Sequence, residues 1–484
     1  MRVLFVNPPA FNELTTQVGK EITENSSFQP PLGLLYIASY LRTQGDHEIR
    51  VIDSQVDRLS YEQLKAAIAD WRPDIVGLTA LTFTMVDVMM TAALVKKIDP
   101  DCPVCLGGPH VDIYTQETIR LKHVDFVITK PGESSFSILV KQLEGSRRFD
   151  QVPGLSYKDE NQDVHSNPQT PTTLTLDDLP FPDRTLLPFQ KYYSIMTANR
   201  PVGTMVTAKG CPYMCVFCSE RGSKPTWRSG RSVAAEMLEA KSIGIKEMFF
   251  VDDTFYVKKQ ASMEISQALI DLHVGMPWGA RARVNNLDQG MLEKFRESGC
   301  QRLHIGVEAG TDRVLKILQK NITTDQARRA FKLCRDNGIN TMAYFIIGNP
   351  GETLEDVQAT FRLACELEPT TVQFSRMTPM PATELYEMGL RSGLFPDYWR
   401  EFSRDPLGSI ERGFRPKMWT ENFSEEELFA LADHHTRKFY FRPKYMARSV
   451  VAVRSFHDLK RKTRAAVDLF HGTRQSTTRL QKLI

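Results

Sequence analysis

The sequence predicts an α/β fold with three parts: an N-terminal doubly wound, Rossmann-like sheet, a partial (β/α)6 barrel and a helical C-terminal region. Short apolar runs alternate with helical patterns in two separate series, and a proline-rich stretch lies between them. Strands that are joined by crossover helices run parallel, which defines the fold class. The 484 residues suffice for about three domains. A composition of 42% hydrophobic and 25% charged residues excludes a disordered or fibrous chain.

The first series occupies residues 1–145. Its expected strands are 2–7, 49–53, 74–80, 104–107 and 126–129, and its expected helices are 32–44, 61–71 and 85–98. Ligands of doubly wound sheets bind at the carboxyl ends of the strands. A ligand is therefore expected at 7–9, 53–54, 79–81 and 107–110.

Residues 146–200 contain six prolines and little periodicity, which predicts a linker that is ordered by its neighbours. The second series occupies 201–395, with expected strands at 202–209, 246–252, 278–284, 301–308, 340–348 and 370–377. Helices fit the gaps, for example 232–243, 260–273, 288–298 and 354–367. Six such units are too few for an eight-fold barrel, so a partial barrel is expected. Residues 396–484 are expected to be helical and basic.

Three cysteines follow the first strand of the second series. They are Cys211, Cys215 and Cys218, with the spacing C-x-x-x-C-x-x-C. Thiolates are the usual ligands of iron–sulfur clusters, which normally take four. Three close cysteines without a fourth nearby leave one iron open, and an open position is typical of a catalytic metal centre. The alternatives are a zinc site with a ligand from elsewhere, or three unrelated cysteines.

This motif resembles the signature of the radical S-adenosylmethionine (radical SAM) enzymes, with Phe217 at their aromatic position. The resemblance implies a [4Fe-4S] cluster on Cys211, Cys215 and Cys218, with S-adenosylmethionine on the open iron. It implies that the reduced cluster cleaves S-adenosylmethionine to a 5′-deoxyadenosyl radical. It also implies an external one-electron reductant of the flavodoxin or ferredoxin type.

Later strand ends resemble further segments of the family in their order along the chain. Arg281 and Arg283 end the third strand of this series and are expected to point charge into the barrel. Besides Phe217, the resemblance places these residues near the cofactor: Asp252, Asp253, Arg283, Glu308, Gly348 and Met377. Carboxylates and glycines at strand ends also serve helix caps and turns, so each position has a structural alternative.

The N-terminal series resembles the cobalamin-binding domain that precedes the barrel in one branch of this superfamily. The first strand is not followed by G-x-G-x-x-G, which argues against a dinucleotide. The resemblance places these residues near cobalamin: Asn7, Pro8, Leu32, Thr79, Leu81, Gly107, Gly108 and His110. The D-x-H-x-x-G element that supplies a histidine to cobalt in methionine synthase is absent. His110 is a candidate replacement, although a lone histidine in a turn is more often a hydrogen-bonding residue.

Cys102 and Cys105 form a C-x-x-C motif that leads into a strand. A redox pair of this kind normally opens a helix, whose dipole lowers a thiol pKa. Structural cysteines are therefore expected at both positions.

The net charge of +3 conceals an uneven distribution. Residues 437–484 contain 13 Lys or Arg and two acids, a net charge of +11, and the rest of the chain carries −8. An amphipathic basic helix to about Phe470 could contact a membrane surface, contact RNA, or pack as a solvated face on an acidic body. Of the two functional options the membrane surface is preferred, because no aromatic residues are interleaved with the charge, and nucleic acid is not expected; the packed, solvated face stays open beside it. The N-terminus shows no secretory signal, and the apolar stretch 75–95 contains Asp87, so a cytoplasmic protein with peripheral membrane contact is expected.

These features predict a cobalamin-dependent radical SAM enzyme that methylates an unactivated carbon of a small molecule such as a lipid, a tetrapyrrole or a peptide. One alternative is a radical cyclase of the anaerobic tetrapyrrole-cyclase type, because a fold does not settle a function. A methylthiotransferase acting on tRNA would carry a different N-terminal domain. The alternative outside the enzymes is a cobalamin or iron–sulfur sensor.

Overall fold

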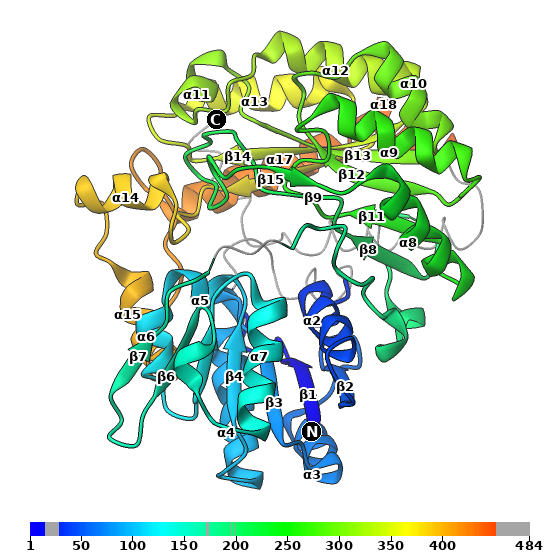
Figure 1. Ribbon diagram of the computed structural model, residues 1–484. Helices are drawn as coiled ribbons and strands as arrows, with labels where there is room; N and C mark the ends of the chain where they lie inside the picture. Colours follow the sequence, from blue (N-terminus) through cyan, green and yellow to red (C-terminus); the bar gives the residue numbers. More distant parts are fainter. Residues whose placement is uncertain (15–28, 171–173, 195, 198, 452–484) are drawn as a thin grey trace. The chain divides into compact units, whose positions relative to one another are not determined.

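The computed structural model describes residues 1–14, 29–170, 174–194, 196–197 and 199–451. The chain divides into two compact units. Among the described residues, the first unit comprises 1–14, 29–193 and 396–416, and the second comprises the rest of 194–395 together with 417–451. Each unit is built around its own sheet (Figure 1).

The sheet of the first unit has the strand order β2-β1-β3-β4-β5-β6-β7. Its parallel strands are β1 (Arg2–Asn7), β2 (Glu48–Asp53), β3 (Ile75–Thr79), β4 (Val104–Gly107) and β5 (Phe126–Ile128). Successive strands of the chain are added on one side of β1 for β2 and on its other side for β3 to β5, so the strand order reverses between β1 and β3. In doubly wound sheets this reversal is the point where ligands bind.

Helices pack around this sheet. They are α2 (Leu32–Arg42), α3 (Tyr61–Trp71), α4 (Met85–Ile98), α5 (Pro109–Ile113), α6 (Thr115–Ile119), α7 (Gly132–Glu144), α15 (Tyr398–Arg404) and α16 (Pro406–Glu411). Leu35 of α2 and Phe136 of α7 are buried against Phe5 of β1, with the Phe5 and Phe136 ring centres 5.0 Å apart. The alternation predicted for residues 1–145 is confirmed as a doubly wound sheet.

The proline-rich segment differs from the expected linker. β6 (Leu155–Lys158) and β7 (Val164–Ser166) extend the first sheet by antiparallel pairing onto β5. Leu155 and Tyr192 are buried in the same core as β1. This long-range burial, which local proline content does not reveal, makes the chain up to Tyr193 part of the first unit.

The segment after residue 395 also divides differently from the expected single region. Residues 396–416 belong to the first unit, because Trp399 of α15 is fully buried and packs edge-on against Phe83 at 5.9 Å. Residues 417–451 belong to the second unit and contain α17 (Glu425–Tyr440) and α18 (Pro443–Val451). The remaining residues of the predicted basic tail, 452–484, lie outside the described residues.

The second unit contains a six-stranded parallel sheet with the order β15-β14-β13-β12-β11-β8. The strands are β8 (Val202–Met205), β11 (Glu247–Phe250), β12 (Trp278–Ala282), β13 (Cys300–Glu308), β14 (Asn340–Ile347) and β15 (Thr371–Arg376). Its other helices are α8 (Gly230–Ser242), α9 (Lys259–Asp271), α10 (Gln289–Glu297), α11 (Asp312–Ile317), α12 (Thr324–Asp336), α13 (Leu354–Leu367) and α14 (Glu384–Arg391). The prediction of six strand–helix units is confirmed.

Strand β12 shows how this sheet presents two different faces. Trp278 points toward the helices, where its ring stacks on Phe250 at 4.9 Å and meets Phe295 of α10 at 5.5 Å. Successive side chains of a strand point to opposite faces. Arg281 therefore lies on the face away from this aromatic core.

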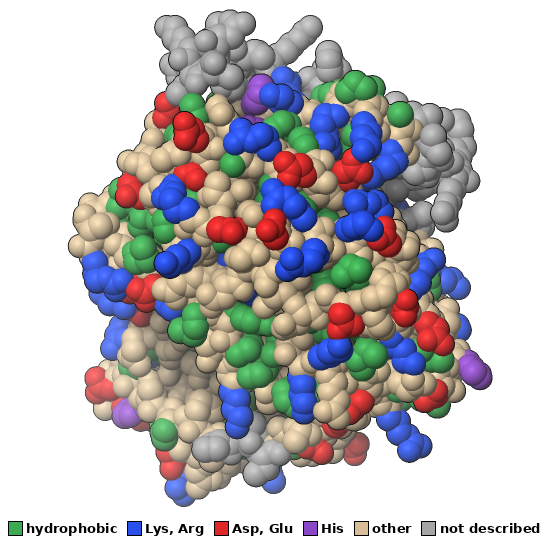
Figure 2. All heavy atoms as spheres, turned by 90° about the horizontal axis from the view of Figure 1, so that it is seen from above, with side chains coloured by type: hydrophobic (Ala, Val, Ile, Leu, Met, Phe, Trp, Pro, Cys, Tyr) green, Lys and Arg blue, Asp and Glu red, His purple; other side chains and the backbone are tan. Residues whose placement is uncertain are grey.

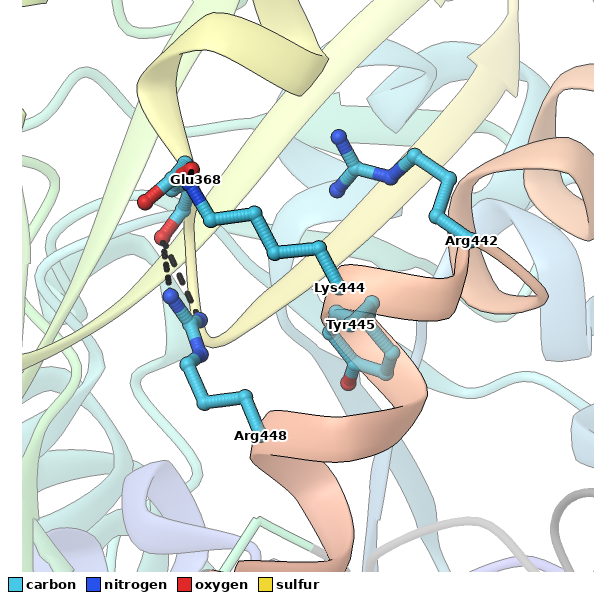
Figure 3. A pocket seen from close by; sticks show the side chains of 5 residues that line it. All are labelled: Glu368, Arg442, Lys444, Tyr445 and Arg448. Carbon is cyan, nitrogen blue, oxygen red and sulfur yellow. Dashed lines mark hydrogen bonds and ion pairs between the residues drawn. The ribbon is translucent and has the colours of Figure 1, made fainter.

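Helix α18 docks on the C-terminal end of α13, where backbone carbonyls lack helical partners. Arg442 donates to the carbonyl of Cys365 at 3.3 Å, and Arg448 donates to the carbonyl of Pro369 at 3.0 Å. Arg448 also donates to the carbonyl of Glu368, as the dashed lines in Figure 3 show. Lys444 pairs with the Glu368 carboxylate. These basic side chains are thus used within the second unit.

The apolar stretch 75–95 forms β3 and most of α4. Asp87 is buried and accepts hydrogen bonds from the backbone and side chain of Asn12 and from the Tyr61 hydroxyl. Within the part of the chain that the structure describes, no helix combines the length and apolar character needed to cross a membrane.

Candidate cofactor sites

The three cysteines lie on the loop between β9 (Ala208–Lys209) and β10 (Thr226–Trp227). Cys211 and Cys215 are buried and Cys218 is partly buried. Burial raises the pKa of the Cys218 thiol and the Cys211 and Cys215 sulfurs raise it further, so the three side chains lie near one another. No three His, Cys, Asp or Glu side chains of the described residues converge on a single ion. In a [4Fe-4S] cluster each thiolate binds a different iron, and this donor set fits such a cluster.

Backbone contacts fix the shape of the cysteine loop. Gly210 has φ of +86°, and a Cβ at this position would lie 2.5 Å from the carbonyl oxygen of Lys224. Ser223 Oγ accepts a hydrogen bond from the backbone N–H of Cys211 at 2.8 Å. Val216 donates to the Leu318 carbonyl at 3.1 Å and accepts from Leu385 N–H at 2.8 Å, so the loop is held between α11 and α14.

The predicted residues Asp252 and Asp253 hold the backbone that leads into this loop. Asp252 is buried, and its Oδ1 accepts hydrogen bonds from the N–H groups of Thr207 at 2.6 Å and Ala208 at 3.0 Å. Burial raises the pKa of Asp252 to about 6. Asp253 is exposed and accepts from Gly210 N–H at 3.1 Å. Both carboxylates therefore position the cysteine loop.

The predicted residue Arg283 lies directly at the cysteine loop. Its Nη1 is 3.5 Å from Cys215 Sγ, and its guanidinium lies 3.7 Å from the centre of the Tyr213 ring. Arg283 is 4% exposed, so this cation contacts a sulfur that is itself buried.

The predicted residue Glu308 pairs with Lys320, a residue that was not among the predicted ones. Glu308 Oε1 and Lys320 Nζ are 2.7 Å apart and both side chains are buried. Lys320 Nζ also lies 5.7 Å from the centre of the Phe217 ring, which places this ion pair beside the cysteine loop. Lys320 lies between α11 and α12 and belongs to no recognisable motif, so only the fold reveals it.

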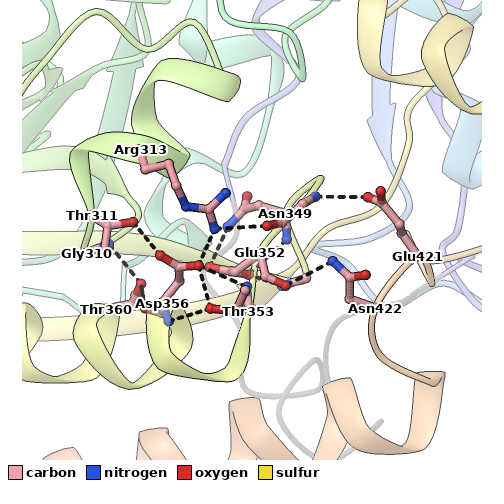
Figure 4. Close-up of polar contacts among 12 residues, drawn as sticks. Gly310, Thr311, Arg313, Asn349, Glu352, Thr353, Asp356, Thr360, Glu421 and Asn422 are labelled. Atoms are coloured by element: carbon pink, nitrogen blue, oxygen red, sulfur yellow. Dashed lines mark hydrogen bonds and ion pairs between the residues drawn. The ribbon is translucent and has the colours of Figure 1, made fainter.

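The predicted residues Gly348 and Met377 belong to the framework at the strand ends. Gly348 N–H donates to Glu352 Oε2 at 2.7 Å, and a Cβ at Gly348 would lie 2.6 Å from Leu428 of α17. Met377 is 2% exposed, and its N–H donates to the Ile347 carbonyl at 2.8 Å. Figure 4 shows the polar network around Glu352 that joins this end of β14 to α13.

A further group of polar and aromatic side chains lies on the sheet face opposite the Trp278 core. It consists of Phe249, Arg281, His304 and Tyr344. His304 Nδ1 is 2.9 Å from the Tyr344 hydroxyl, and the His304 ring lies 4.7 Å from the ring of Phe249. Burial, with Arg302 and Arg281 nearby, lowers the pKa of His304 to about 3, so this imidazole is neutral. Arg281 is exposed and donates to the Val251 carbonyl at 3.0 Å. The group offers a small molecule an aromatic wall, a neutral imidazole and a cation.

In the first unit, the parallel register places Asn7, Thr79 and Gly107 side by side at the carboxyl ends of their strands. Leu81 beside them is 44% exposed. Only the Ile128 carbonyl, at 3.8 Å, lies within 4 Å of a Cβ built on Gly107, so few protein atoms cover the backbone there. An exposed apolar side chain beside a thinly covered backbone suits a large, partly apolar ligand such as cobalamin.

Other predicted residues at these strand ends make contacts within the first unit. Asn7 Nδ2 donates to Asp53 Oδ1 at 2.8 Å, and the Pro8 carbonyl accepts from Gln55 at 3.1 Å. Leu32 is buried on α2. Gly108 has φ of +110°, and a Cβ there would lie 2.9 Å from the Ala80 carbonyl oxygen.

His110 lies inside the first unit. The side chain is 0% exposed, and its Nδ1 is 3.1 Å from Thr82 Oγ1. Burial lowers its pKa to about 3. Neither imidazole nitrogen reaches the surface in this structure, so the conformation described here is that of a core histidine.

The C-x-x-C pair has the surroundings expected of structural cysteines. Cys102 and Cys105 are buried at the start of β4. Burial raises the pKa of both thiols, that of Cys102 to about 12, and therefore keeps them protonated.

Two family models match the chain in the order in which the two sites occur. The B12 binding domain matches residues 23–140, and the Radical SAM superfamily matches residues 205–364. The fold and the two sites therefore define a radical SAM enzyme with a cobalamin-binding domain.

Relatives narrow this class. The uncharacterized methyltransferase PH0819 of Pyrococcus horikoshii is 33% identical over 481 residues, which cover 97% of this chain and 99% of the relative. The anaerobic magnesium-protoporphyrin IX monomethyl ester cyclase of Rubrivivax gelatinosus is 30% identical over 80% of this chain and 70% of the relative. The structure of the radical S-adenosylmethionine methyltransferase TsrM from Kitasatospora setae, with cobalamin and a [4Fe-4S] cluster bound, superposes with a TM-score of 0.66. It covers 81% of this chain and 78% of that one at 19% identity, which shows the shared fold.

The chain belongs to the cobalamin-dependent radical SAM methyltransferase family. It is an enzyme that uses a [4Fe-4S] cluster, S-adenosylmethionine and cobalamin. The zinc and sensor alternatives are thereby set aside.

Proposed function

We propose that this enzyme methylates an unactivated carbon atom of a small molecule. The observation that carries the proposal is the 33% identity to a methyltransferase along nearly the whole of both chains. When bound, the cluster and S-adenosylmethionine supply a 5′-deoxyadenosyl radical, and cobalamin supplies the methyl group.

The residues of the second unit divide the work of binding. Cys211, Cys215 and Cys218 hold the cluster, and the Glu308–Lys320 pair and Phe217 lie beside it, where they contact S-adenosylmethionine. The buried position of the ion pair keeps both charges in a fixed geometry, because neither partner can leave without stranding the other.

The substrate contacts the group formed by Phe249, Arg281, His304 and Tyr344. Arg281 is exposed and has no carboxylate partner among the described residues, so a carboxylate or phosphate of the substrate would supply its counter-ion. At neutral pH the uncharged His304 acts as a hydrogen-bonding group rather than as a second cation.

Anaerobic reconstitution tests the proposal. The full chain is loaded with iron, sulfide and cobalamin, reduced, and incubated with S-adenosylmethionine whose methyl group is isotopically labelled, together with a cell small-molecule extract. We expect reductive formation of 5′-deoxyadenosine and one product that gains the intact labelled methyl group. The Cys215→Ala variant should form no more 5′-deoxyadenosine than a mixture without enzyme. Cys365 is a half-buried cysteine on α13, and the Cys365→Ala variant should form as much as the wild type. Persistent cleavage by Cys215→Ala would contradict the ligand assignment.

A radical cyclase is the second candidate, because the cyclase of Rubrivivax gelatinosus is 30% identical. The same incubation separates the two functions. Cyclisation gives a product that has lost hydrogen atoms and carries no label, whereas methylation gives a labelled product of higher mass.

Two partners complete the proposal. A small one-electron carrier of the flavodoxin or ferredoxin type would reduce the cluster, since the reaction needs one electron for each cleavage. The basic residues of the C-terminal tail would contact an anionic membrane surface, because each Lys or Arg near such a surface contributes about 1 kcal/mol.

A further inference from the structure

Arg283 is fixed beside the cysteine loop by contacts on every side of its guanidinium. Nη1 is 3.5 Å from Cys215 Sγ, Nη2 donates to the carbonyl of Lys320, and Nε donates to Asn285 Oδ1 at 3.2 Å. The Tyr213 ring covers the guanidinium at 3.7 Å. With this many contacts the guanidinium cannot rotate away from the sulfur without losing several hydrogen bonds.

The charge of Arg283 has no carboxylate counter-ion among the described residues, and the side chain is only 4% exposed. A buried cation without an anion nearby is costly. The Cys215 sulfur lies 3.5 Å from Nη1 and is a thiolate, and therefore an anion, when it binds iron. The positive charge of Arg283 and the negative charge of a cluster-bound Cys215 thiolate would therefore compensate each other.

We propose that Arg283 donates a charge-assisted hydrogen bond to the cluster-bound Cys215 thiolate and thereby sets the reduction potential of the cluster. This inference rests on the proposed ligation of the cluster by Cys215. Reduction adds one negative charge to the cluster, and a nearby cation with a hydrogen bond to a ligand sulfur stabilises the more negative state. Arg283 thus raises the potential and makes the cluster easier to reduce.

The geometry also assigns a part to Tyr213, which precedes Cys215 by two residues. Its ring centre lies 3.7 Å from the guanidinium, so the loop that carries the ligand also packs against the side chain that contacts it. Arg283 is accordingly a positioning residue that acts through Cys215.

The test is an EPR-monitored redox titration of the reconstituted full-length enzyme, without S-adenosylmethionine and with the iron content measured for each variant. We expect Arg283→Gln to lower the equilibrium constant for reduction at least about tenfold, which corresponds to about 59 mV for a one-electron couple. Arg283→Lys keeps the charge but cannot make the same set of contacts, so its potential should lie between the two. Tyr213→Leu should move the potential in the same direction as Arg283→Gln.

Arg281→Gln is the matched control. Arg281 lies two residues earlier, within β12, and donates to the Val251 carbonyl rather than to a cysteine. A smaller shift in this variant than in Arg283→Gln separates the direct hydrogen bond from the general loss of a positive charge.

A wild-type potential in Arg283→Gln at full iron content would overturn the proposal, as would equal shifts in the two arginine variants. If Arg283→Gln takes up no cluster, wild-type potentials in both Arg283→Lys and Tyr213→Leu overturn it. Failure of the wild-type chain itself to bind a cluster contradicts the proposed function instead, so the two failures are distinguishable.

Discussion

Buried carboxylates near the strand ends show what single residues contribute to this site. The family resemblance predicts Asp252 near the cofactor, and in the structure its Oδ1 accepts hydrogen bonds from the backbone that precedes Cys211. A carboxylate at a strand end has the same sequence pattern whether it faces a ligand or a loop. Side-chain direction is a property of the fold, so this distinction could not be predicted from the sequence.

Glu352 gives a prediction at this scale. It is fully buried, accepts from the N–H groups of Gly348 and Asn349, and burial raises its pKa to about 7 (Figure 4). Because the folded pKa lies above the ordinary 4.5, its stabilising effect is complete below about pH 4.5 and is lost as the pH rises through about 7. Between pH 5 and 8, the free energy of unfolding of the wild type should fall relative to that of Glu352→Gln by up to about 3 kcal/mol.

Urea unfolding of the second unit at a series of pH values measures this difference. Asp356→Asn is the control. Burial raises the Asp356 pKa, but hydrogen bonds from Thr353, Arg313 and Thr311 outweigh burial and lower it to about 2. Its stabilising effect is lost only at acid pH, so the difference between wild type and Asp356→Asn should stay constant from pH 5 to 8. A constant difference for Glu352→Gln as well would show that its carboxyl group titrates normally.

At the scale of elements, periodicity predicted the regular helices and strands well and the irregular ones poorly. The helices Tyr61–Trp71 and Met85–Ile98 and the strand Arg2–Asn7 have the predicted bounds, because each buries one clear apolar stripe or run. β7 is a short strand whose residues are mostly exposed, and it is held by pairing with β6. No local apolar pattern marks such a strand, so the sequence predicts a linker there.

The contact between β13 and α13 gives the second prediction. Gly310 lies just after β13, and a Cβ at this position would be 2.2 Å from the backbone nitrogen of Thr360 in α13. Gly310→Ala should therefore push the helix away and destabilise the second unit by about 1–3 kcal/mol. Gly290→Ala is the matched control, because Gly290 is an exposed position of α10 where a Cβ would meet only Asp288 Oδ1 at 3.8 Å, and it should be neutral or stabilise by up to about 1 kcal/mol. Thermal unfolding of both variants checks the pair, and equal stabilities would refute the close contact.

Across the whole molecule, the basic residues of the C-terminal part fall into two sets: those that contact the rest of the protein and those that could contact a partner. Acidic and basic side chains are interspersed on the face shown in Figure 2. Of the 13 basic residues in 437–484, five lie in the described part: Arg437, Lys438, Arg442, Lys444 and Arg448. They contact Asp433, the Phe361 ring or the C-terminal end of α13, as expected for a face packed on the body. The case for a membrane contact therefore depends on the eight basic residues of 452–484.

This division defines the last prediction. Residues 452–484 carry a net charge of +6, and at about 1 kcal/mol per basic residue near an anionic surface their removal should weaken binding markedly. We expect a chain that ends at residue 451 to bind vesicles containing phosphatidylserine at least about tenfold more weakly than the full chain, with the difference shrinking at high salt. A chain that ends at residue 442 should lose no further binding, because the basic residues of α18 are already used on α13. Vesicle co-sedimentation with neutral phosphatidylcholine vesicles as the control measures all three chains. Equal partition of the full and shortened chains would leave the tail without a membrane role, and a larger loss on removing α18 would show that its basic face is available after all.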